Sequence, residues 1–254
     1  PTMGALHAGH ISLIKASKSR CDVTICSIYV NPTQFNSQKD LRNYPTKTNK
    51  DIQLLEKNHC DILFLPNDFE LYEDNLKSDK FDLNNLDNFM EGEYRPGHFQ
   101  GVATVVTKLF KIINPDIAFF GEKDLQQLII IKHIVKESDL KIVSVPTVRE
   151  KNGIALSSRN NNLTKDSLKS ATIIFESLCY CRDHINKYDI VTLKNKVKKL
   201  FERSKFNLEY LEFVSMKTMH PVDVICDNLA ICIAVRIENI RLIDNIIINA
   251  EETN

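Results

Sequence analysis

Apolar positions in the first 150 residues follow two alternating periods. Four short apolar runs, each bounded by turn residues, predict strands buried on both faces of a sheet. These runs span residues 23–30, 62–65, 117–120 and 142–145. Between them, apolar residues recur at helical spacing over about 11–19, 49–58, 102–113 and 125–137. Strands that alternate with helices predict an α/β fold, a doubly wound parallel sheet with right-handed crossover connections.

The pattern changes near Val148. Thr164 is expected to cap a helix that runs to about His184, and two β-like runs come later. The other patterned segments are a basic helix at about 190–204, the β-like runs at 208–214 and 229–236, and an apolar strand or helix tail at 246–248. We therefore predict two domains, residues 1–147 with the parallel sheet and residues 148–254 as a smaller α+β domain.

Composition points to a small-molecule partner. The 254 residues contain 33 Lys and Arg against 33 Asp and Glu, so no net field favours nucleic acid or an anionic membrane. No apolar run reaches the roughly 18 residues that a membrane-spanning helix needs, and no secretory leader is visible. We expect a cytoplasmic protein that binds neither nucleic acid nor membrane.

The cysteines agree with a reducing compartment. All seven are scattered and mostly embedded in apolar patterns, which predicts buried free thiols. One close pair, Cys179 and Cys181, lies in a helical pattern where a spacing of two residues points the thiols apart. A metal site at that pair is therefore disfavoured.

Two histidines mark the amino end of the chain. His7 and His10 lie three residues apart where a polar, glycine-containing turn leads into the first predicted helix, so their side chains are expected one above the other. Free backbone N–H groups and the positive end of the helix dipole collect at such a position, which suits a polyphosphate. Gly4 and Gly9 would let the polyphosphate approach the backbone. Taken alone, the same residues fit a capped helix with two exposed histidines.

Polar motifs follow several of the predicted strands, where ligands of such sheets bind. Taken singly, each motif fits ordinary turn or linker chemistry. Lys123 could reach a phosphate oxygen, and Asp124 could accept from ribose hydroxyls. Ser157, Ser158 and Arg159 place two hydroxyls and a guanidinium in a loop, a combination that suits a triphosphate. Two further loops, residues 31–35 and 92–99, supply amides, Arg95 and His98.

In order along the chain, these motifs resemble those of the pantothenate synthetase family, the ATP-dependent ligases that join pantoate to β-alanine. The matching stretches are P-T-M-G-A-L-H-x-G-H, V-N-P-x-Q-F, R-P-G-H-F-x-G-V, G-E-K-D-x-Q-Q, P-T-V-R-E and L-S-S-R-N, within residues 1 to about 165. The rest of the chain matches only in length and pattern. The resemblance implies a Rossmann-like domain that binds nucleotide and pantoate, followed by a smaller lid domain.

The resemblance also implies residue roles. The ATP-binding residues would be Met3, Gly4, Ala5, Leu6, His7, Ala8, Gly9, His10, Gly121, Glu122, Lys123, Asp124, Val148, Leu156, Ser157, Ser158 and Arg159. The catalytic ones among them would be His10, His7, Lys123, Ser157, Ser158 and Arg159, with His10 as proton donor. Gln34 and Gln127 would hold pantoate, and Gln34 would also lie near β-alanine. The implied roles of Arg95 and His98 are less defined.

The same resemblance implies a two-step reaction with Mg-ATP, through a pantoyl adenylate, and a homodimer. It gives no magnesium ligands, because phosphate oxygens and water supply most of them. Two departures from the family pattern, Leu125 for an aromatic residue and Leu156 for methionine, are expected to matter little. Family members also carry a segment ahead of the position of Pro1 that includes the first strand of the sheet. If the chain begins at Pro1, we expect unpaired strand edges and low stability.

Other interpretations stay open at this point. A nucleotidyltransferase that adenylylates a phosphorylated acceptor shares the H-x-G-H motif but would not need Gln34 and Gln127 as a pair. An inactive nucleotide-binding module is disfavoured by the intact His7, His10, Lys123 and Arg159. A tRNA-charging enzyme is disfavoured because no basic surface excess is visible.

Overall fold

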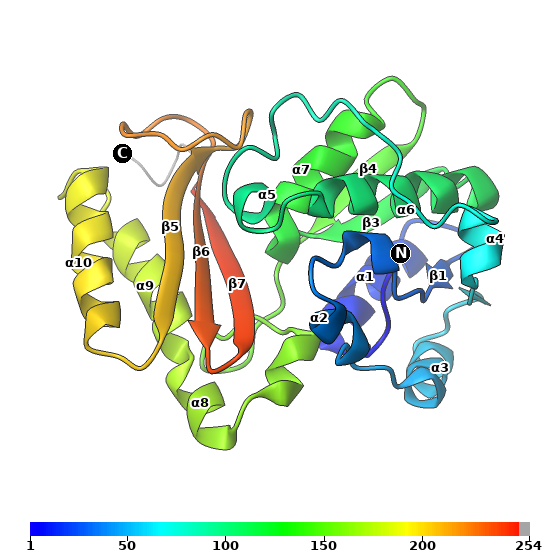
Figure 1. The fold of residues 1–254 in the computed structure, drawn as a ribbon, viewed down its shortest axis with the longest axis horizontal. Helices are drawn as coiled ribbons and strands as arrows, with labels where there is room; N and C mark the ends of the chain where they lie inside the picture. Colours follow the sequence, from blue (N-terminus) through cyan, green and yellow to red (C-terminus); the bar gives the residue numbers. More distant parts are fainter. Residues whose placement is uncertain (249–254) are drawn as a thin grey trace. The chain divides into compact units, whose positions relative to one another are not determined.

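The computed structural model describes residues 1–248 (Figure 1). The chain divides into two compact units, and each has a hydrophobic core of its own. The first unit holds residues 1–87, 91–122 and 126–148. The second holds residues 149–248 together with two short segments, Asn88–Met90 and Lys123–Leu125. The main change from one unit to the other thus falls between Val148 and Arg149.

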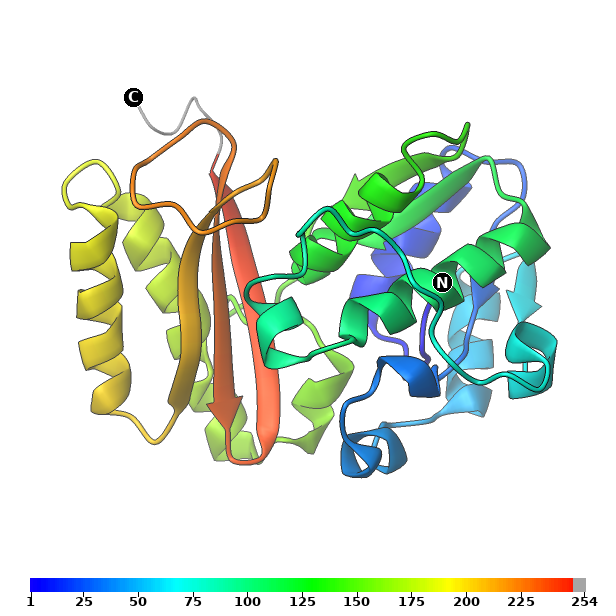
Figure 2. The same ribbon diagram turned by 45° about the horizontal axis from the view of Figure 1, so that its top comes forward.

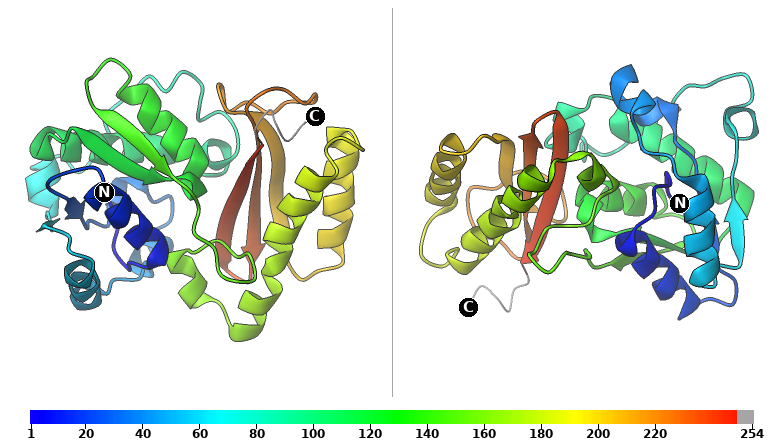
Figure 3. Two further views of the ribbon diagram at one scale, coloured as in Figure 1. Left: turned by 180° about the vertical axis from the view of Figure 1, so that it is seen from behind. Right: turned by 90° about the horizontal axis from the view of Figure 1, so that it is seen from below.

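Helices and strands alternate along the first unit, which confirms the predicted α/β class. The helices are α1 (Ala8–Lys18), α2 (Gln38–Arg42), α3 (Thr48–Lys57), α4 (Asp68–Tyr72), α5 (Glu91–Tyr94), α6 (His98–Ile113) and α7 (Leu125–Ile134), with short 3₁₀ turns η1 (Pro32–Gln34) and η2 (Glu122–Asp124). The strands are β1 (Ile25–Ser27), β2 (Ile62–Phe64), β3 (Ile117–Gly121) and β4 (Lys141–Val145). Both strand pairs, β1–β2 and β3–β4, are parallel, and the green pair β3–β4 is plain in Figure 3.

The parallel strands form two two-stranded sheets instead of one continuous sheet. β1 pairs with β2 on one edge, and on the other edge Thr2 makes a single parallel bridge to Ile28, just beyond β1. A cavity of about 470 Å³ is lined by residues of β1, β3, α1 and α6. The prediction of strands buried on both faces is wrong for β2, because Leu63 packs on the core formed by α1, α3 and β1 while Ile62, on the other face, is 49% exposed.

Several element boundaries differ from the prediction. α1 begins at Ala8 instead of Ile11, because His7 already acts as the N-cap. α6 begins at His98 instead of Val102, after Gly97 takes a left-handed backbone (φ 80°) as its N-cap. The helix predicted from Thr164 to His184 is two helices that meet at Ala171, and Thr164 caps the first of them as predicted.

The second unit is an antiparallel sheet with helices on one face. Its elements are η3 (Ser158–Asn162), α8 (Lys165–Ser170), α9 (Thr172–Asp183), α10 (Ile190–Glu202), β5 (Asn207–Ser215), β6 (Leu229–Ile237) and β7 (Ile240–Ile248). The strands lie side by side in the order β5-β6-β7 (Figure 2). Of the last strand, only residues 246–248 carried a signal in the sequence, because Arg241, Asp244 and Asn245 interrupt its apolar pattern.

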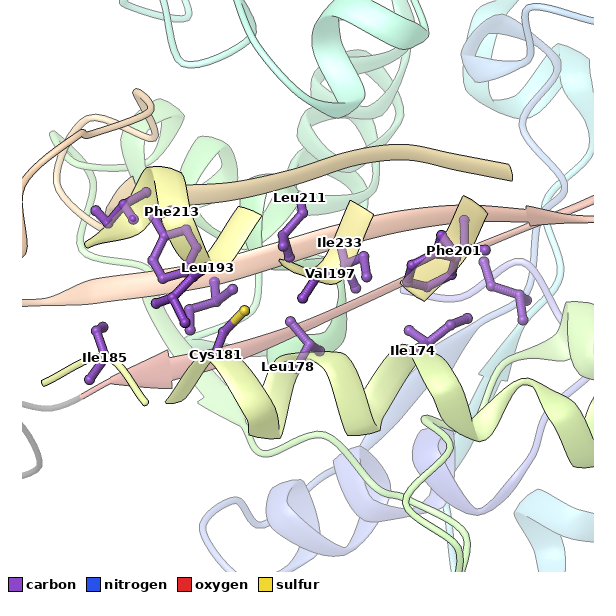
Figure 4. Close-up of a cluster of buried hydrophobic side chains, with 14 of the residues drawn as sticks. Ile174, Leu178, Cys181, Ile185, Leu193, Val197, Phe201, Leu211, Phe213 and Ile233 are labelled. Carbon is purple, nitrogen blue, oxygen red and sulfur yellow. The ribbon is translucent and has the colours of Figure 1, made fainter. Parts of the chain in front are cut away.

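Alternate residues of the three strands face α9 and α10. Leu211, Phe213 and Ile233 point toward the helices. Leu178 of α9 and Val197 of α10 belong to the same core (Figure 4). Leu178, Phe213 and Ile233 are fully buried. Burying side chains of this size contributes about 1.5–3 kcal/mol each, so this core is the main source of stability in the unit.

Half-buried Arg149 and buried Asp244 form an ion pair in the second unit. The guanidinium donates to both carboxylate oxygens, at 2.6 and 2.9 Å, and to the carbonyls of Gly153 and Asn245. It also lies over the Phe175 ring, 4.2 Å from its centre. Burial raises the pKa of the Asp244 carboxyl, and the contact with Arg149 opposes that rise. The pair therefore ties the segment after Val148 to β7.

All seven cysteines are free thiols, as predicted, but only Cys26, Cys181 and Cys232 are buried as expected; the other four are half-buried. Burial raises the pKa of Cys26 to about 11 and that of Cys181 to about 12, so these thiols are unreactive at neutral pH. Cys181 lies in the core of the second unit, whereas Cys179 is only half-buried. Within residues 1–248, no group of three or more His, Cys, Asp or Glu side chains is arranged to hold a metal ion. No helix in that range is both long and apolar enough to cross a membrane.

Candidate active site

His7 and His10 form a reciprocal hydrogen-bonded cap at the start of α1. The His7 Nδ1 accepts from the Gly9 N–H at 3.1 Å, and the His10 Nδ1 accepts from the His7 N–H at 3.2 Å. This is the arrangement of a capping box, with two imidazoles in place of the usual hydroxyl and carboxylate. The ring centres lie 4.1 Å apart, as the spacing of three residues predicts.

The capping bonds also assign the tautomer of each neutral ring. A backbone N–H can only donate, so the Nδ1 atoms of His7 and His10 must accept and carry no proton. The ring proton of each neutral imidazole then resides on Nε2. Each neutral ring therefore carries its N–H on Nε2, at the positive end of the helix dipole.

The predicted supply of free backbone N–H groups at this turn is largely wrong. The N–H groups of Ala5 and Leu6 both donate to the carboxylate of Asp51, each at 2.8 Å. The Gly4 N–H bonds to the Thr2 hydroxyl, and those of His7 and Gly9 serve the capping box. The turn satisfies these donors internally because its backbone is left-handed at Gly4 (φ 81°) and Ala5 (φ 49°), which points successive N–H groups at one acceptor.

Gln34 lies at the end of η1, and its side-chain amide is oriented by neighbours. The Asn31 amide donates to the Gln34 Oε1 at 3.1 Å, and the Asn31 Oδ1 accepts from the Tyr72 hydroxyl at 2.7 Å. With its oxygen engaged, Gln34 directs its NH₂ group toward the sulfur of Met3, 3.2 Å away. Gln34 thus contacts the same turn that carries the histidines. It offers a donor, which suits a carboxylate or hydroxyl oxygen.

His98 and Arg95 support the main chain of Gln34. The His98 Nδ1 lies 2.9 Å from the Gln34 carbonyl oxygen, and the Arg95 guanidinium reaches the same oxygen at 3.5 Å. Arg95 and His98 are also in contact with each other, at 3.1 Å. His98 is 6% exposed, so the geometry gives it a positioning role at Gln34.

The second glycine of the R-P-G-H-F-x-G-V stretch is Gly101, which lies where α6 packs against η1. A Cβ at this position would lie 2.6 Å from the Thr33 carbonyl oxygen and 2.7 Å from the Gln34 nitrogen. The Gly101 carbonyl also accepts from the Asn31 amide. Only glycine therefore lets α6 pack this closely against η1.

If Gln34 holds pantoate, as the family resemblance implies, Gly101→Ala should weaken pantoate binding by displacing η1. Overpacking of this kind costs roughly 1–3 kcal/mol of stability, and the displaced Gln34 should raise the KM for pantoate more than the KM for ATP. Steady-state kinetics and thermal unfolding would measure both effects. Val197→Ala, in the hydrophobic core of the second unit, is the control for lost stability, because Val197 lies outside η1 and α6 and has no proposed role in the site; equal effects of the two changes on the KM for pantoate would contradict the role of Gly101.

The two consecutive glutamines at the start of α7 differ in their hydrogen bonding. Gln126 is 5% exposed; it accepts from the Glu91 N–H and donates to the Leu86 carbonyl. Gln127 is half-buried, and its side chain makes no hydrogen bond within residues 1–248. Gln126 is thus a packing residue, and Gln127 is the one available to a ligand.

The cationic candidates belong to the second unit. The Lys123 ammonium lies 3.4 Å from the Asp124 carboxylate, and the Lys123 carbonyl accepts from the Asn245 amide at 2.9 Å. Ser157 caps η3 by accepting from the Arg159 N–H at 3.3 Å, and Ser158 is buried. Two further candidates, Val148 and Leu156, are half-buried. The predicted catalytic and pantoate-binding residues thus fall into two groups. The histidines and glutamines belong to the first unit, and the cations and hydroxyls belong to the second.

Asp51, Asn31 and Tyr72 hold candidate residues in place. Sequence reasoning gave Asp51 and Tyr72 no role and counted Asn31 only as an amide of the loop at residues 31–35. One signal for Asp51 was available. It precedes Leu55 by four residues in a helical pattern, and both are buried on α3, so an acid stands on the apolar face of that helix.

Comparison with known proteins decides the family. The family model of pantoate–β-alanine ligases matches residues 1–247. The chain belongs to that family. A pantothenate synthetase from Azobacteroides pseudotrichonymphae is 47% identical over 253 residues, covering 97% of this chain and 90% of its own length. A solved pantothenate synthetase from Thermus thermophilus superposes with a TM-score of 0.92 at 35% identity, covering 97% of this chain and 91% of its own.

A third relative carries ligands. The pantoate–β-alanine ligase from Francisella tularensis, solved with β,γ-ATP and β-alanine, is 40% identical and superposes with a TM-score of 0.81. The match covers 97% of this chain and 87% of that one. These findings confirm the family resemblance, the Rossmann-like fold with a smaller second domain, and the activity of a ligase that joins pantoate to β-alanine.

Proposed function

We propose that the chain joins pantoate to β-alanine in two steps at the expense of ATP, through a pantoyl adenylate. The observation that carries this proposal is the histidine capping box, which holds two Nε2–H donors at the start of α1. Donors placed in advance stabilise charge that develops on phosphate oxygens without having to reorganise during the reaction.

In the first step, a pantoate carboxylate oxygen attacks the α-phosphorus of ATP. The new O–P bond forms as the bond to the bridging oxygen breaks, and pyrophosphate leaves with that electron pair. The Nε2–H groups of His7 and His10 donate to the phosphate oxygens, and Lys123 and Arg159 supply positive charge for the departing pyrophosphate. Ser157 and Ser158 add hydroxyl donors. No protein nucleophile takes part.

We assign pantoate to Gln34 and Gln127. The NH₂ group of Gln34 is the side that Asn31 leaves available for an acceptor, and Gln127 has an unengaged amide within the described residues. Met3, Gly4, Ala5, Leu6, Ala8 and Gly9 would line the nucleotide, with Gly121, Glu122, Asp124, Val148 and Leu156 completing its site. Because Asp51 binds the Ala5 and Leu6 N–H groups, the contribution of these two residues is one of shape.

In the second step, the amine of β-alanine attacks the acyl carbon of the adenylate. The C–N bond forms, the bond from that carbon to the phosphate oxygen breaks, AMP leaves, and the nitrogen loses a proton. Gln34 lies next to this position in the proposal. The relative from Francisella tularensis supports the use of both substrates in this reaction, because that protein was solved with β,γ-ATP and β-alanine.

Magnesium enters this proposal with the nucleotide. The described residues offer no cluster of three or more ligating side chains, so they do not build a cage for the ion. We assign its coordination to phosphate oxygens and water, which is how Mg²⁺ is usually bound beside nucleotides. We also propose a cytoplasmic location, which the scattered free cysteines favour, and a homodimer, which the family resemblance implies; light scattering of the purified protein tests its mass.

The proposed first step predicts pantoate-dependent exchange of labelled pyrophosphate into ATP. The exchange should need pantoate and Mg²⁺ but no β-alanine, and net AMP formation should need both pantoate and β-alanine. Phosphorylated acceptors, such as phosphopantetheine, replace pantoate in the control assay. Exchange with those acceptors and none with pantoate would contradict the proposal.

A further inference from the structure

Asp51 is a buried carboxylate that the proposed chemistry does not use. It lies on α3, is 2% exposed, and accepts two hydrogen bonds of 2.8 Å from consecutive backbone N–H groups. Those N–H groups belong to Ala5 and Leu6, immediately before His7. A buried acid is costly unless it is bonded in this way, so the contact between α3 and this turn is specific.

The turn needs such an anchor. Ala5 has a left-handed backbone, which an L-residue with a side chain rarely adopts, and it follows a second left-handed residue, Gly4. This conformation aims both N–H groups at one point, which is occupied by an oxygen pair of the same carboxylate. Without the carboxylate, the buried Ala5 N–H and the part-buried Leu6 N–H would lose their acceptor, and the strained conformation would lose its support.

The same turn determines the position of the His7 main chain and so of the histidine pair. Leu6 is followed directly by His7, whose N–H donates to His10 and whose Nδ1 caps Gly9. A shift of the Leu6 main chain therefore moves the His7 N–H and alters both capping bonds. Such a shift would reposition both Nε2 donors at once.

We propose that Asp51 is a positioning residue for catalysis, which holds the turn before His7 so that both imidazoles keep their Nε2–H groups directed at the ATP phosphates. The proposal rests on the proposed role of His7 and His10. Asp51 touches neither substrate nor reacting atoms; it acts through the Ala5 and Leu6 backbone. It also takes two donors away from phosphate, so that the histidines become the donors of this turn.

Two substitutions test the proposal. Asp51→Asn keeps the volume but places an NH₂ group against one of the two N–H donors, and Asp51→Ala removes both acceptors. We expect Asp51→Asn to lower kcat roughly 10–100-fold, on the scale of a catalytic group misplaced by about 1 Å, while the KM for pantoate changes little. The KM for pantoate is spared because Asn31 and His98, not Asp51, hold Gln34.

A matched control is available in the same unit. The Asp61 carboxylate also accepts from a backbone N–H, that of Thr24 at 2.7 Å, and it pairs with Lys18. Both contacts lower the pKa of Asp61. Asp61→Asn removes the charge and should reduce stability slightly, but kcat should stay at the wild-type value because Asp61 does not contact the turn before His7.

Nitrogen-15 NMR of the histidine rings gives a readout that a purely structural role would not move. In the folded wild-type protein, His7 and His10 should show the shifts of the Nε2–H tautomer. Asp51→Asn should yield mixed tautomers for both rings while the protein stays folded, as judged by thermal unfolding. Unchanged tautomers together with wild-type kcat in folded Asp51→Asn would overturn the proposal.

The proposed function and the role of Asp51 can fail separately. If the wild-type protein shows no pantoate-dependent pyrophosphate exchange, the proposed function is wrong. If the wild-type exchanges pyrophosphate and Asp51→Asn exchanges it equally fast, only the role of Asp51 is wrong. If Asp51→Ala does not fold, Asp51→Asn with the NMR readout still decides.

Discussion

Replacing His7 by asparagine is expected to reduce pantoate-dependent pyrophosphate exchange about 10²–10³-fold with little loss of stability. Asparagine is among the best N-cap residues, so its Oδ1 can accept from the Gly9 N–H as the His7 Nδ1 does. The substitution therefore removes the ring N–H and keeps the cap. His10→Gln should have the same effect. It removes the ring N–H of His10 but keeps the cap, because glutamine at the third helical position completes a capping box.

The comparison with alanine separates chemistry from folding. His7→Ala loses the same donor and also the cap, which should lower stability by about 0.5–2 kcal/mol. Equal activity but different melting temperatures for His7→Asn and His7→Ala would show that the lost donor causes the rate effect. His133→Asn, at a histidine in the last turn of α7, is the control for loss of a ring. Near-normal exchange in both His7→Asn and His10→Gln would contradict the assignment.

The sequence predicted how the two histidines lie relative to each other better than it predicted the residues around them. The H-x-G-H spacing placed two imidazoles together because three residues nearly complete a helical turn. The same reasoning could not show that His7 lies outside the helix and caps it, since that depends on the left-handed backbone at Gly4 and Ala5. Asp51, 46 positions from Ala5, was missed because no local pattern records a contact across that distance.

The fold shows the same division between local and long-range information. Strands with uniform apolar runs, such as β3 and β6, were predicted within one residue at each end. Most of β7 was missed because Arg241, Asp244 and Asn245 break its apolar pattern. These polar residues have partners in the folded unit, for example Arg149 for Asp244, 95 positions away, and no periodicity anticipates such a pair.

Replacing Arg149 by methionine is expected to destabilise the second unit by about 3–5 kcal/mol. Methionine fills much of the same volume over Phe175 but leaves the Asp244 carboxylate buried and unpaired, apart from its own backbone contacts. Chemical unfolding at neutral pH would measure the loss. Arg236→Met is the control, because that side chain is 45% exposed and its partner Glu209 also pairs with Arg241, so we expect less than about 1 kcal/mol.

The pH dependence gives the Arg149 prediction its sign. Burial raises the pKa of Asp244, and losing the Arg149 charge removes the first opposing cause, so the pKa rises further in the variant. A carboxyl with a raised pKa binds its proton more tightly in the folded state than in the unfolded state. The stability of the variant then falls as the pH rises from the unfolded-state pKa of the carboxyl to its raised folded-state pKa. Acidification through the same range restores the lost stability. The defect of Arg149→Met should therefore shrink as the pH is lowered toward about 4, the usual carboxyl value. Adding Asp244→Leu to Arg149→Met should abolish this pH dependence and restore much of the stability. If neither acid nor the second substitution changes the loss of stability, an unpaired Asp244 carboxylate is not the cause of that loss.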